Sequence, residues 1–408
     1  MALDLTALRA HFPSLATGLA YFDGPGGTQT PRPVADAIAA TLTGPLSNRG
    51  TVSPSELNAE RAVADFRAAY ADLLHMPAGG IVHGRSATQL TYDFSRHLAK
   101  GWTAGDEIVL SRLDHDANVR PWVQAAERAG VTVRWIEIDA ETTELDLDSY
   151  ERSLSPRTRL VAVTAASNVL GTKPPVRALA DRAHAVGALV YVDGVHYAAH
   201  HLVDVPALGA DLFVCSPYKF LGPHCGVLAA APGLLETLRP DKLLPSPDTV
   251  PERFEFGTLP YEILAGATAA VDFLAAMDAG TTGTTGATAT EASRRERLTR
   301  SMNSLHDHEL TLRTRLQEGL DALGDALTLH SKAPDRTPTV LMTLEGRDAR
   351  EAQAHLATRG VLAPAGSFYA YEPFTALKLT DPALRVGLAP YNTADDVDRL
   401  LDGLTAFL

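Results

Sequence analysis

The sequence predicts an α/β protein, with a large domain built on a mostly parallel sheet and a smaller α+β domain after it. Short apolar runs rich in β-branched residues alternate with helical patterns as far as about residue 230, which is typical of a sheet covered by helices on both faces. Beyond a further long helical pattern, the last part of the chain mixes helices and strands. At 408 residues the chain is long enough to bury a core in each domain.

Composition and charge narrow the class of protein. The hydrophobic share of 45% and the charged share of 21% are ordinary for a soluble enzyme. The net charge of −13, without a basic block, argues against a nucleic-acid partner. No apolar run reaches membrane-spanning length, and the N-terminus reads as an amphipathic helix, not a signal peptide. The two cysteines supply neither a disulfide framework nor a zinc site, so we expect a cytoplasmic protein without a metal or a membrane partner.

The chain is expected to divide into three parts. These are an N-terminal helix that packs with the small domain, the large domain and the small domain, at residues 1–20, 21–270 and 271–408. The low-complexity stretch at 279–293 is expected to be a flexible loop of the small domain. Elsewhere the clearest patterns are helices that begin near residue 33 and cover 55–74 and 305–323, and strands near 339–344 and 385–388.

The stretch DLFVCSPYKFLGPHCG, Asp211 to Gly226, carries the first candidate catalytic residue. An apolar strand runs into a turn through Gly222 and Pro223, and Lys219 lies at the exposed end of that strand. Desolvation there would lower the pKa of the ammonium group, so that a neutral amine is available to form a Schiff base with an aldehyde. The alternative is a surface lysine on a loop.

A second strand pattern, ALVYVD, ends in Asp193, at the edge where open α/β sheets bind ligands. Asp193 precedes Lys219 by 26 residues, about the length of one strand–connection–strand unit. An acid and a lysine on neighbouring strand ends suit pyridoxal 5′-phosphate (PLP). The lysine would carry the cofactor's aldehyde, and the carboxylate would keep the pyridine nitrogen protonated.

The segment IVHGRSATQL, from Ile81, predicts a phosphate site. A short strand and Gly84 lead through small hydroxyl residues into an amphipathic helix. The free N–H groups and the dipole at such a helix start bind anions, and Ser86 and Thr88 add hydroxyl donors. An ordinary helix N-cap is the alternative.

Other candidate residues follow predicted strands. His115, in the cluster Asp114 to Asn118, would stack on the cofactor ring opposite the lysine and help to move protons, unless the cluster is a metal pair or a solvated turn. Asn168 would hydrogen-bond the cofactor's phenolic oxygen, unless it belongs to a turn. Arg385 begins an apolar strand, where a charge needs an anionic partner. That partner is either a substrate α-carboxylate or a side chain of the same chain.

Several motifs together resemble one family across nearly the whole chain, the fold-type I PLP enzymes of class V aminotransferase type, which include the cysteine desulfurases. The motifs are YFDGPGGTQ, ATQ, DHDANVRPW, TAASNVLGT, VDGVHYAAH, SPYKFLGPH, FEFGT and RVGLAPYNTADDVDRLL. The resemblance implies a seven-stranded type of sheet in the large domain, PLP as cofactor, an amino acid as substrate, and a homodimer with the active site at its interface.

The resemblance also implies roles for individual residues. Lys219 would be the Schiff-base lysine, Asp193 would contact the pyridine nitrogen and His115 would stack on the ring. His196 takes the position that contacts the phenolic oxygen, which is usually glutamine in desulfurases. The remaining cofactor positions are Ala87, Thr88, Asn168, Ser216, Tyr218 and, reaching the phosphate from the partner subunit, Thr258. The substrate-side positions are Arg49, Asn168, Tyr369 and Arg385.

One position departs from the desulfurases. These enzymes carry a nucleophilic cysteine on a small-domain loop, three residues after a glycine. Matching AGSFYA to that loop places Gly366 on the glycine and Tyr369 on the cysteine. A phenol cannot form a persulfide. Cys225 lies in a turn of the large domain, and Cys215 reads as a small core residue.

We therefore expect a PLP-dependent enzyme that cleaves the C–S bond of cysteine or of a cysteine S-conjugate by β-elimination. Lys219 would remove the α-proton. An epimerase similar to isopenicillin N epimerase is the first alternative, with Tyr369 or His115 as the second acid. An aminotransferase is another alternative, and a non-catalytic protein that keeps only the fold is the most distant one.

Overall fold

The computed structural model describes residues 3–279 and 292–408, so the loop expected at 279–293 lies almost wholly outside the described residues. A seven-stranded sheet forms the centre of the large domain, in the order β2-β8-β7-β6-β5-β3-β4. The strands run parallel except β8, which is antiparallel to both of its neighbours. The expected mostly parallel sheet is therefore confirmed. Its strands are β2 (Ile81–Gly84), β3 (Glu107–Ser111), β4 (Thr132–Ile136), β5 (Thr158–Thr164), β6 (Leu189–Asp193), β7 (Leu212–Cys215) and β8 (Gly226–Ala230).

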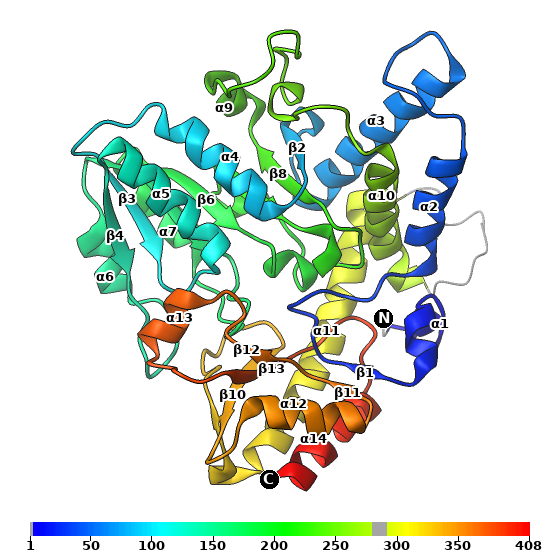
Figure 1. Cartoon of the computed structure of the whole chain (residues 1–408), viewed down its shortest axis with the longest axis vertical. Helices are drawn as coiled ribbons and strands as arrows, with labels where there is room; N and C mark the ends of the chain where they lie inside the picture. The colour runs from blue at the N-terminus through cyan, green and yellow to red at the C-terminus, as the bar shows by residue number, and fades with distance from the viewer. Residues whose placement is uncertain (1–2, 280–291) are drawn as a thin grey trace.

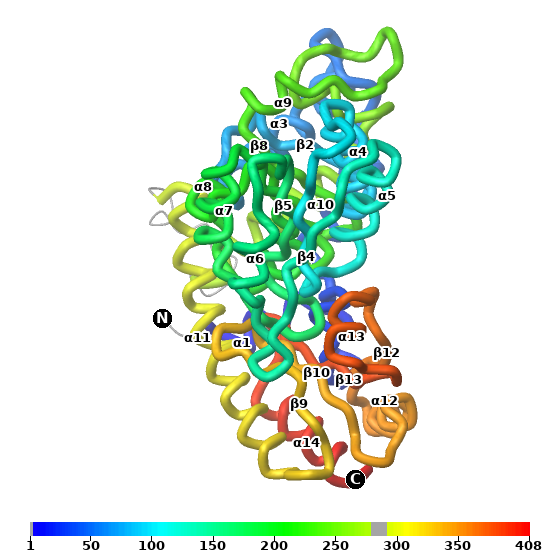
Figure 2. Tube along the Cα trace, turned by 90° about the vertical axis from the view of Figure 1, so that its left-hand side faces the viewer, coloured from blue at the N-terminus to red at the C-terminus, as the bar shows by residue number. Residues whose placement is uncertain are grey.

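Helices cover both faces of this sheet, which explains its nearly continuous apolar strands. Figure 2 shows α4 (Ala87–Ala99) and α5 (Arg120–Ala129) on one face and α7 (Val176–Ala185) and α8 (Val205–Leu208) on the other. Successive residues of β6 point to opposite faces of the sheet. Tyr191 packs with α4 and α5, while Val190 and Val192 belong to the core on the other face. Other short helices of this domain are α6 (Leu147–Ser153) and α9 (Pro232–Thr237).

The C-terminal part of the chain folds around a second, four-stranded antiparallel sheet, in the order β12-β13-β10-β9 (Figure 1). Its strands are β9 (Leu327–Leu329), β10 (Thr339–Leu344), β12 (Ala365–Gly366) and β13 (Ala383–Gly387). The helices of this region are α12 (Ala349–Thr358), α13 (Tyr371–Ala376) and α14 (Ala394–Phe407). A separate parallel pair joins β1 (Ala20–Tyr21) to β11 (Val361–Leu362).

One long helix, α11 (Arg294–Asp321), belongs to both cores. Its first half contributes Leu298 and Leu305 to the large core, and its second half contributes Leu312 and Leu316 to the small one. The helix starts 11 residues earlier than the helix expected at 305–323, because Ser293 and Glu296 form a capping box at its N-terminus. We propose that the domain division lies within α11, later than residue 271.

The contacts of helix α10 and of the N-terminal segment also indicate which parts of the chain belong together. Helix α10 (Tyr261–Ala276) packs on α2 (Arg32–Thr43) and α3 (Pro54–Leu74), all within the large domain. After α1 (Leu5–Ala10), the ring of Phe12 meets Phe273 and Tyr391, at centroid distances of 5.8 and 5.1 Å. Arg9 pairs with Asp396 of α14 at 3.0 Å. The N-terminal segment therefore contacts both domains, not the small domain alone.

Among the residues that the structure describes, none of the helices is both long and apolar enough to cross a membrane. The cytoplasmic location expected from the sequence stays a prediction.

Candidate active site

The carboxyl ends of four parallel strands bring the central candidate residues together. His115, Asn168, Asp193 and Lys219 lie at or just after the ends of β3, β5, β6 and β7. These ends meet at one edge of the sheet and border a cavity. Its inner part, of about 90 Å³, is lined by Ala87, Thr88, His115, Asn168, Asp193, His196, Ser216, Tyr218 and Lys219, among others. Its outer part, of about 610 Å³, also includes Tyr369 and Arg385.

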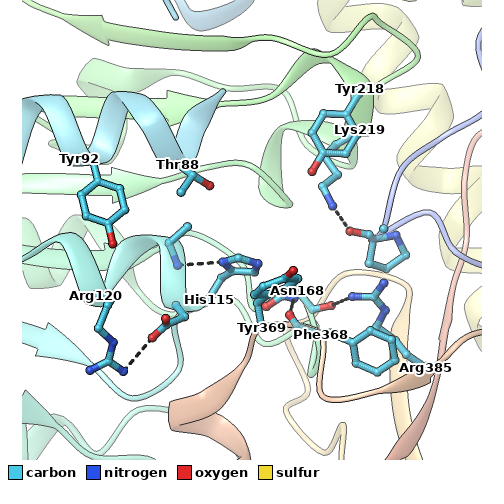
Figure 3. Close-up of a pocket in the computed structure, with 14 residues that line it drawn as sticks. Thr88, Tyr92, His115, Arg120, Asn168, Tyr218, Lys219, Phe368, Tyr369 and Arg385 are labelled. Atoms are coloured by element: carbon cyan, nitrogen blue, oxygen red, sulfur yellow. Dashed lines mark hydrogen bonds and ion pairs between the residues drawn. The ribbon is translucent and has the colours of Figure 1, made fainter. Parts of the chain in front are cut away.

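Lys219 ends the short 3₁₀ turn Pro217–Lys219 that follows β7. Its Nζ donates to the carbonyl oxygen of Pro25 and lies 4.8 Å from the centre of the Tyr218 ring. Figure 3 shows Lys219 and Thr88 on one side of the cavity, with Asn168 and Arg385 across from them. Burial, and next the charge of Arg385, lower the pKa of Lys219 to about 7. A large fraction of this amine is therefore neutral, and nucleophilic, near neutral pH.

Asp193 is the neighbouring acid, at the last position of β6. It is 8% exposed, and its Oδ1 accepts a hydrogen bond from the backbone N–H of Val195 at 2.9 Å. Burial raises the pKa of Asp193 to about 6, although this hydrogen bond and the charge of Lys219 oppose the rise. A cationic ring nitrogen in the inner cavity would supply the counter-charge that this carboxylate needs.

The start of α4 forms the anion-binding end of the cavity. Ser86 is the N-cap, and its Oγ accepts from the N–H of Gln89 at 3.1 Å. Ala87 and Thr88 follow and line the inner cavity. Strand β8 passes so close that a Cβ on Gly226 would lie 2.4 Å from the carbonyl carbon of Ser86, so only glycine fits there. Ser86 thus caps α4, which is the alternative role that the sequence analysis considered for it. The start of this helix also faces the cavity.

His115 is a neutral base in this setting. Its Nδ1 accepts from the N–H of Ala117 at 3.0 Å, so its hydrogen is on Nε2. Burial, and next Lys219, lower its pKa to about 4. Asp114 of the same cluster points into the core, where it accepts from Asn118 at 2.7 Å. Among the described residues, no group of three or more His, Cys, Asp or Glu side chains is placed to hold a metal ion.

Asn168 and His196 each present an unused polar atom. Asn168 donates from Nδ2 to the carbonyl oxygen of Phe368 at 3.0 Å, while its Oδ1 is buried and has no partner in residues 3–279 and 292–408. His196 contacts two threonines through Nε2, and its Nδ1 is likewise buried without a partner in these residues. Buried polar atoms without partners are costly, so this cavity is built to receive a polar ligand. With Asp193, Lys219 and the helix start, the donor set fits PLP.

Arg385, on β13, has a partner within the chain. Its Nη2 pairs with Asp23 Oδ1 at 2.5 Å, and its Nη1 donates to the carbonyl oxygen of Asn168 at 3.2 Å. The guanidinium lies 4.0 Å from the centre of the Phe368 ring. Arg385 is 3% exposed, whereas the Asp23 side chain is 44% exposed. Arg385 therefore forms the intrachain salt bridge that the sequence analysis considered as one alternative. This salt bridge lies at the wall of the outer cavity.

Tyr369 lies at the mouth of the cavity and is 76% exposed. Its ring stacks on His115, with centroids 5.6 Å apart and planes 28° apart. Phe368 and Tyr369 both adopt left-handed backbone conformations, with φ of 55° and 54°. The N–H of Asp116 donates to the carbonyl oxygen of Tyr369 at 2.8 Å, which helps to hold this uncommon loop.

Two expected site residues lie elsewhere. Arg49 does not line the cavity of its own chain, because the carboxylate of Glu60 on α3 holds it through two hydrogen bonds of 2.8 Å. A second carboxylate, Glu252, lies 3.6 Å from Arg49. Thr258 lines a different cavity of about 520 Å³, beside Phe256. Within one chain, neither residue joins the site.

Neither of the chain's two cysteines is placed for sulfur transfer at this cavity. Cys215 and Cys225 are 0% and 2% exposed and lie in the large core, outside the lining of both cavity parts. Burial raises the pKa of Cys225 to about 12, so its thiol stays protonated.

Sequence reasoning missed several lining residues. It also missed the partner of Arg385: Asp23 appeared only within the motif YFDGPGGTQ, although an arginine that lacked an anionic partner was a signal for such an acid. The lining residues of the outer part that it missed are Pro25, Gly26, Tyr92, Asp116, Ala117, Arg120 and Phe368.

Comparison with known proteins agrees with this geometry. Residues 20–400 match the family model for class-V aminotransferases. The chain is 31% identical to an uncharacterized protein of Mycobacterium tuberculosis, covering all of both chains. It is 30% identical to a cysteine desulfurase of Enterobacter sp. strain 638, covering 99% of this chain and 98% of the relative.

Solved structures resemble this chain over its whole length. The cysteine desulfurase CsdA of Escherichia coli superposes with a TM-score of 0.84 at 25% identity, covering 100% of this chain and 98% of the other. The fold is also shared with a cysteine desulfurase of Thermococcus onnurineus, with a TM-score of 0.87 at 23% identity, over 100% and 98% of the two chains. The chain therefore belongs to the class-V aminotransferase family and is a PLP-dependent enzyme of fold type I.

Proposed function

We propose that this enzyme cleaves the Cβ–S bond of cysteine or of a cysteine S-conjugate by β-elimination. The relatives named cysteine desulfurases support a sulfur-bearing amino acid as substrate. The observation that carries the proposal is the loop position of Tyr369, where desulfurases have their nucleophilic cysteine. The phenol of Tyr369 cannot accept sulfur, and both thiols of the chain lie outside the cavity lining. The sulfur group would therefore leave into solvent.

The reaction balances without an oxidant or a reductant. L-Cysteine and water give pyruvate, ammonia and sulfide, and an S-conjugate gives the corresponding thiol. When bound, PLP supplies an electron sink for the negative charge that develops at Cα. Lys219, with a pKa of about 7, is the base for the α-proton. Asp193 holds a charge at the closed end of the cavity. At the open end, the substrate carboxylate would replace Asp23 as the partner of Arg385, which would then orient the substrate.

A product assay tests the proposal. Purified protein loaded with PLP is given L-cysteine, cystine and cysteine S-conjugates, and sulfide, thiol, pyruvate and alanine are measured together. Pyruvate formed together with released sulfide or thiol is the expected result. Alanine would contradict the proposal, because it marks sulfur extraction as in a desulfurase. Inversion at Cα without loss of the side chain would indicate the epimerase, and a retained keto acid would indicate an aminotransferase.

Cofactor binding and site variants distinguish an enzyme from a non-catalytic protein with the same fold. Wild-type protein should turn yellow with PLP, and borohydride should trap the cofactor on Lys219. Lys219→Ala should abolish turnover and trapping, whereas Tyr369→Phe should still release pyruvate. Tyr369→Cys restores a thiol at the loop, and we expect this variant to form alanine and to carry a persulfide on the introduced thiol. A protein that stays colourless and takes up no PLP would end every catalytic proposal.

We also propose a homodimer whose partner subunit completes the site. Arg49 and Thr258 lie outside the cavity of their own chain, and Phe256, two residues before Thr258, is a large hydrophobic side chain that is 46% exposed. Light scattering would test the dimer. Mixing Lys219→Ala chains with Thr258→Ala chains would test the shared site, because one intact site forms in each mixed dimer. Monomers that are fully active would contradict the proposal.

A further inference from the structure

His196 lines the inner cavity, and within the part of the chain that the structure describes only one of its two ring nitrogens has a hydrogen-bond partner. It follows β6, at the start of the 3₁₀ turn Tyr197–Ala199, and is 3% exposed. Its Nε2 lies 2.9 Å from Thr337 Oγ1 and 3.0 Å from Thr339 Oγ1. Its Nδ1 is buried and has no partner among the described residues. The small domain thus contacts one nitrogen, and the other is left for a ligand.

The imidazole of His196 is neutral. Burial, and next the charge of His200, hold its pKa well below the ordinary value, and Lys219, Arg385 and His201 act in the same direction. His200 itself lies edge-on at 4.8 Å, and its Nδ1 is taken by the carboxylate of Glu309 on α11 at 2.9 Å. A neutral imidazole carries a single N–H, and its neighbours decide which nitrogen has the hydrogen.

The two threonines favour the hydrogen on Nδ1. Both are buried; Thr339 is the first residue of β10, and Thr337 precedes it. Thr337 Oγ1 has oxygen acceptors for its own hydrogen, in Thr339 Oγ1 at 3.3 Å and the carbonyl of Gly171 at 3.5 Å. The hydroxyl of Thr339 is then free to donate to His196 Nε2. When Nε2 accepts this bond, the ring hydrogen is on Nδ1.

We propose that Thr339, supported by Thr337, is a positioning residue that keeps His196 in the Nδ1–H form, so that His196 donates to the phenolic oxygen of bound PLP. A donor at that oxygen stabilises its negative charge and so lowers the pH at which the cofactor–lysine linkage loses its proton. A strand of the small domain thereby tunes a cofactor that is held by the large domain. The inference applies to any reaction at this cofactor, so its failure would leave the proposed C–S cleavage untouched.

The test is a pH titration of the absorbance of the PLP-loaded protein, without substrate. Thr339→Val keeps the side-chain shape but removes the hydroxyl, and we expect the midpoint of the colour change to rise by about one pH unit. Thr339→Ser should keep the wild-type midpoint. Thr343→Val is the matched control, because Thr343 is on the same strand and contacts His330 Nε2 at 3.0 Å, outside the lining of both cavity parts. It should leave the midpoint unchanged.

An unchanged midpoint in Thr339→Val, or an equal shift in Thr343→Val, would overturn the inference. A second comparison, between His196→Gln and the double variant His196→Gln/Thr339→Val, tests the inference even if Thr339→Val alone binds PLP poorly. His196→Gln donates through an amide, which needs no hydroxyl to select a tautomer. Adding Thr339→Val to His196→Gln should therefore not move the midpoint. A rise as large as the one expected in the wild-type background would show that Thr339 acts by another route, and would overturn the inference.

Discussion

The lowered pKa of Lys219 leads to a quantitative prediction about how the apoprotein captures PLP. Only the neutral amine attacks the cofactor's aldehyde. With a pKa of about 7, half of the Lys219 amines are neutral at pH 7. A lysine with the ordinary pKa of about 10.4 would have roughly four neutral amines in ten thousand at that pH, about 10³-fold fewer. The rate of capture should therefore rise about tenfold per pH unit below 7 and level off above it.

Stopped-flow absorbance measures this rate, by mixing apoprotein with excess PLP between pH 5 and 10. The phosphate of PLP also titrates near pH 6, so the experiment is repeated with pyridoxal, which lacks this group. Pyridoxal should show the same midpoint near 7 with a lower overall rate. Lys219→Ala serves as the blank for capture by other lysines.

The charges near Lys219 predict in which direction a second substitution shifts the capture midpoint. The charge of Asp23 raises the pKa of Lys219 and so opposes the effect of burial and of Arg385. Asp23→Asn should therefore move the capture midpoint below that of the wild type. A wild-type midpoint above pH 9, or an upward shift in Asp23→Asn, would refute the reasoning, since either would mean that burial and Arg385 do not set the pKa of this amine.

Other substitutions make separate predictions. Asp193→Asn should lower kcat/KM by about 10²-fold or more, because it removes the buried charge that pairs with the cofactor ring; steady-state kinetics checks this. Arg385→Lys should raise KM about tenfold while leaving the cofactor spectrum unchanged, since a lysine loses the two-pronged contact with a carboxylate. Cys225→Ala should leave both kinetic constants nearly unchanged, and loss of activity in a folded Cys225→Ala protein would revive a sulfur-transfer role. Gly226→Ala should weaken the binding of PLP about tenfold or more, because the added Cβ displaces the loop before α4, where the phosphate would bind. The binding of pyridoxal, which lacks the phosphate, should be spared. Fluorescence titration measures both affinities, and an equal loss of affinity for the two ligands would contradict this reasoning.

The central site residues could be predicted because they depend on local order along the chain. In a parallel sheet, the residues that follow each strand gather at one edge, whatever the loops do elsewhere. Asp193 ends β6, where it is in register with Val214 of the adjacent β7, and Lys219 follows β7. Strand patterns and short motifs were therefore sufficient to bring His115, Asn168, Asp193 and Lys219 to one cavity.

Contacts between distant segments could not be predicted in the same way. Asp23 and Arg385 are 362 residues apart in the chain, and His196 is 141 residues from Thr337. Their pairing depends on how the small domain docks on the large one, and no local pattern contains that information. Arg49 is another such case: the sequence pattern of its polar loop does not contain its contact with Glu60 on the next helix, and its role toward a substrate stays a prediction.

The loop at Tyr369 shows why a shared fold does not by itself decide the proposed reaction. Its two left-handed residues are held through main-chain oxygens: Asn168 donates to the carbonyl of Phe368, and the N–H of Asp116 donates to the carbonyl of Tyr369. These contacts do not involve the side chain at position 369, so the loop can keep this shape with either a thiol or a phenol there. The backbone can thus keep its form while the side chain at position 369 changes. Under the proposed C–S cleavage, capture or release of the sulfur would depend on this one side chain, so the Tyr369→Cys variant is the sharpest probe of the proposal.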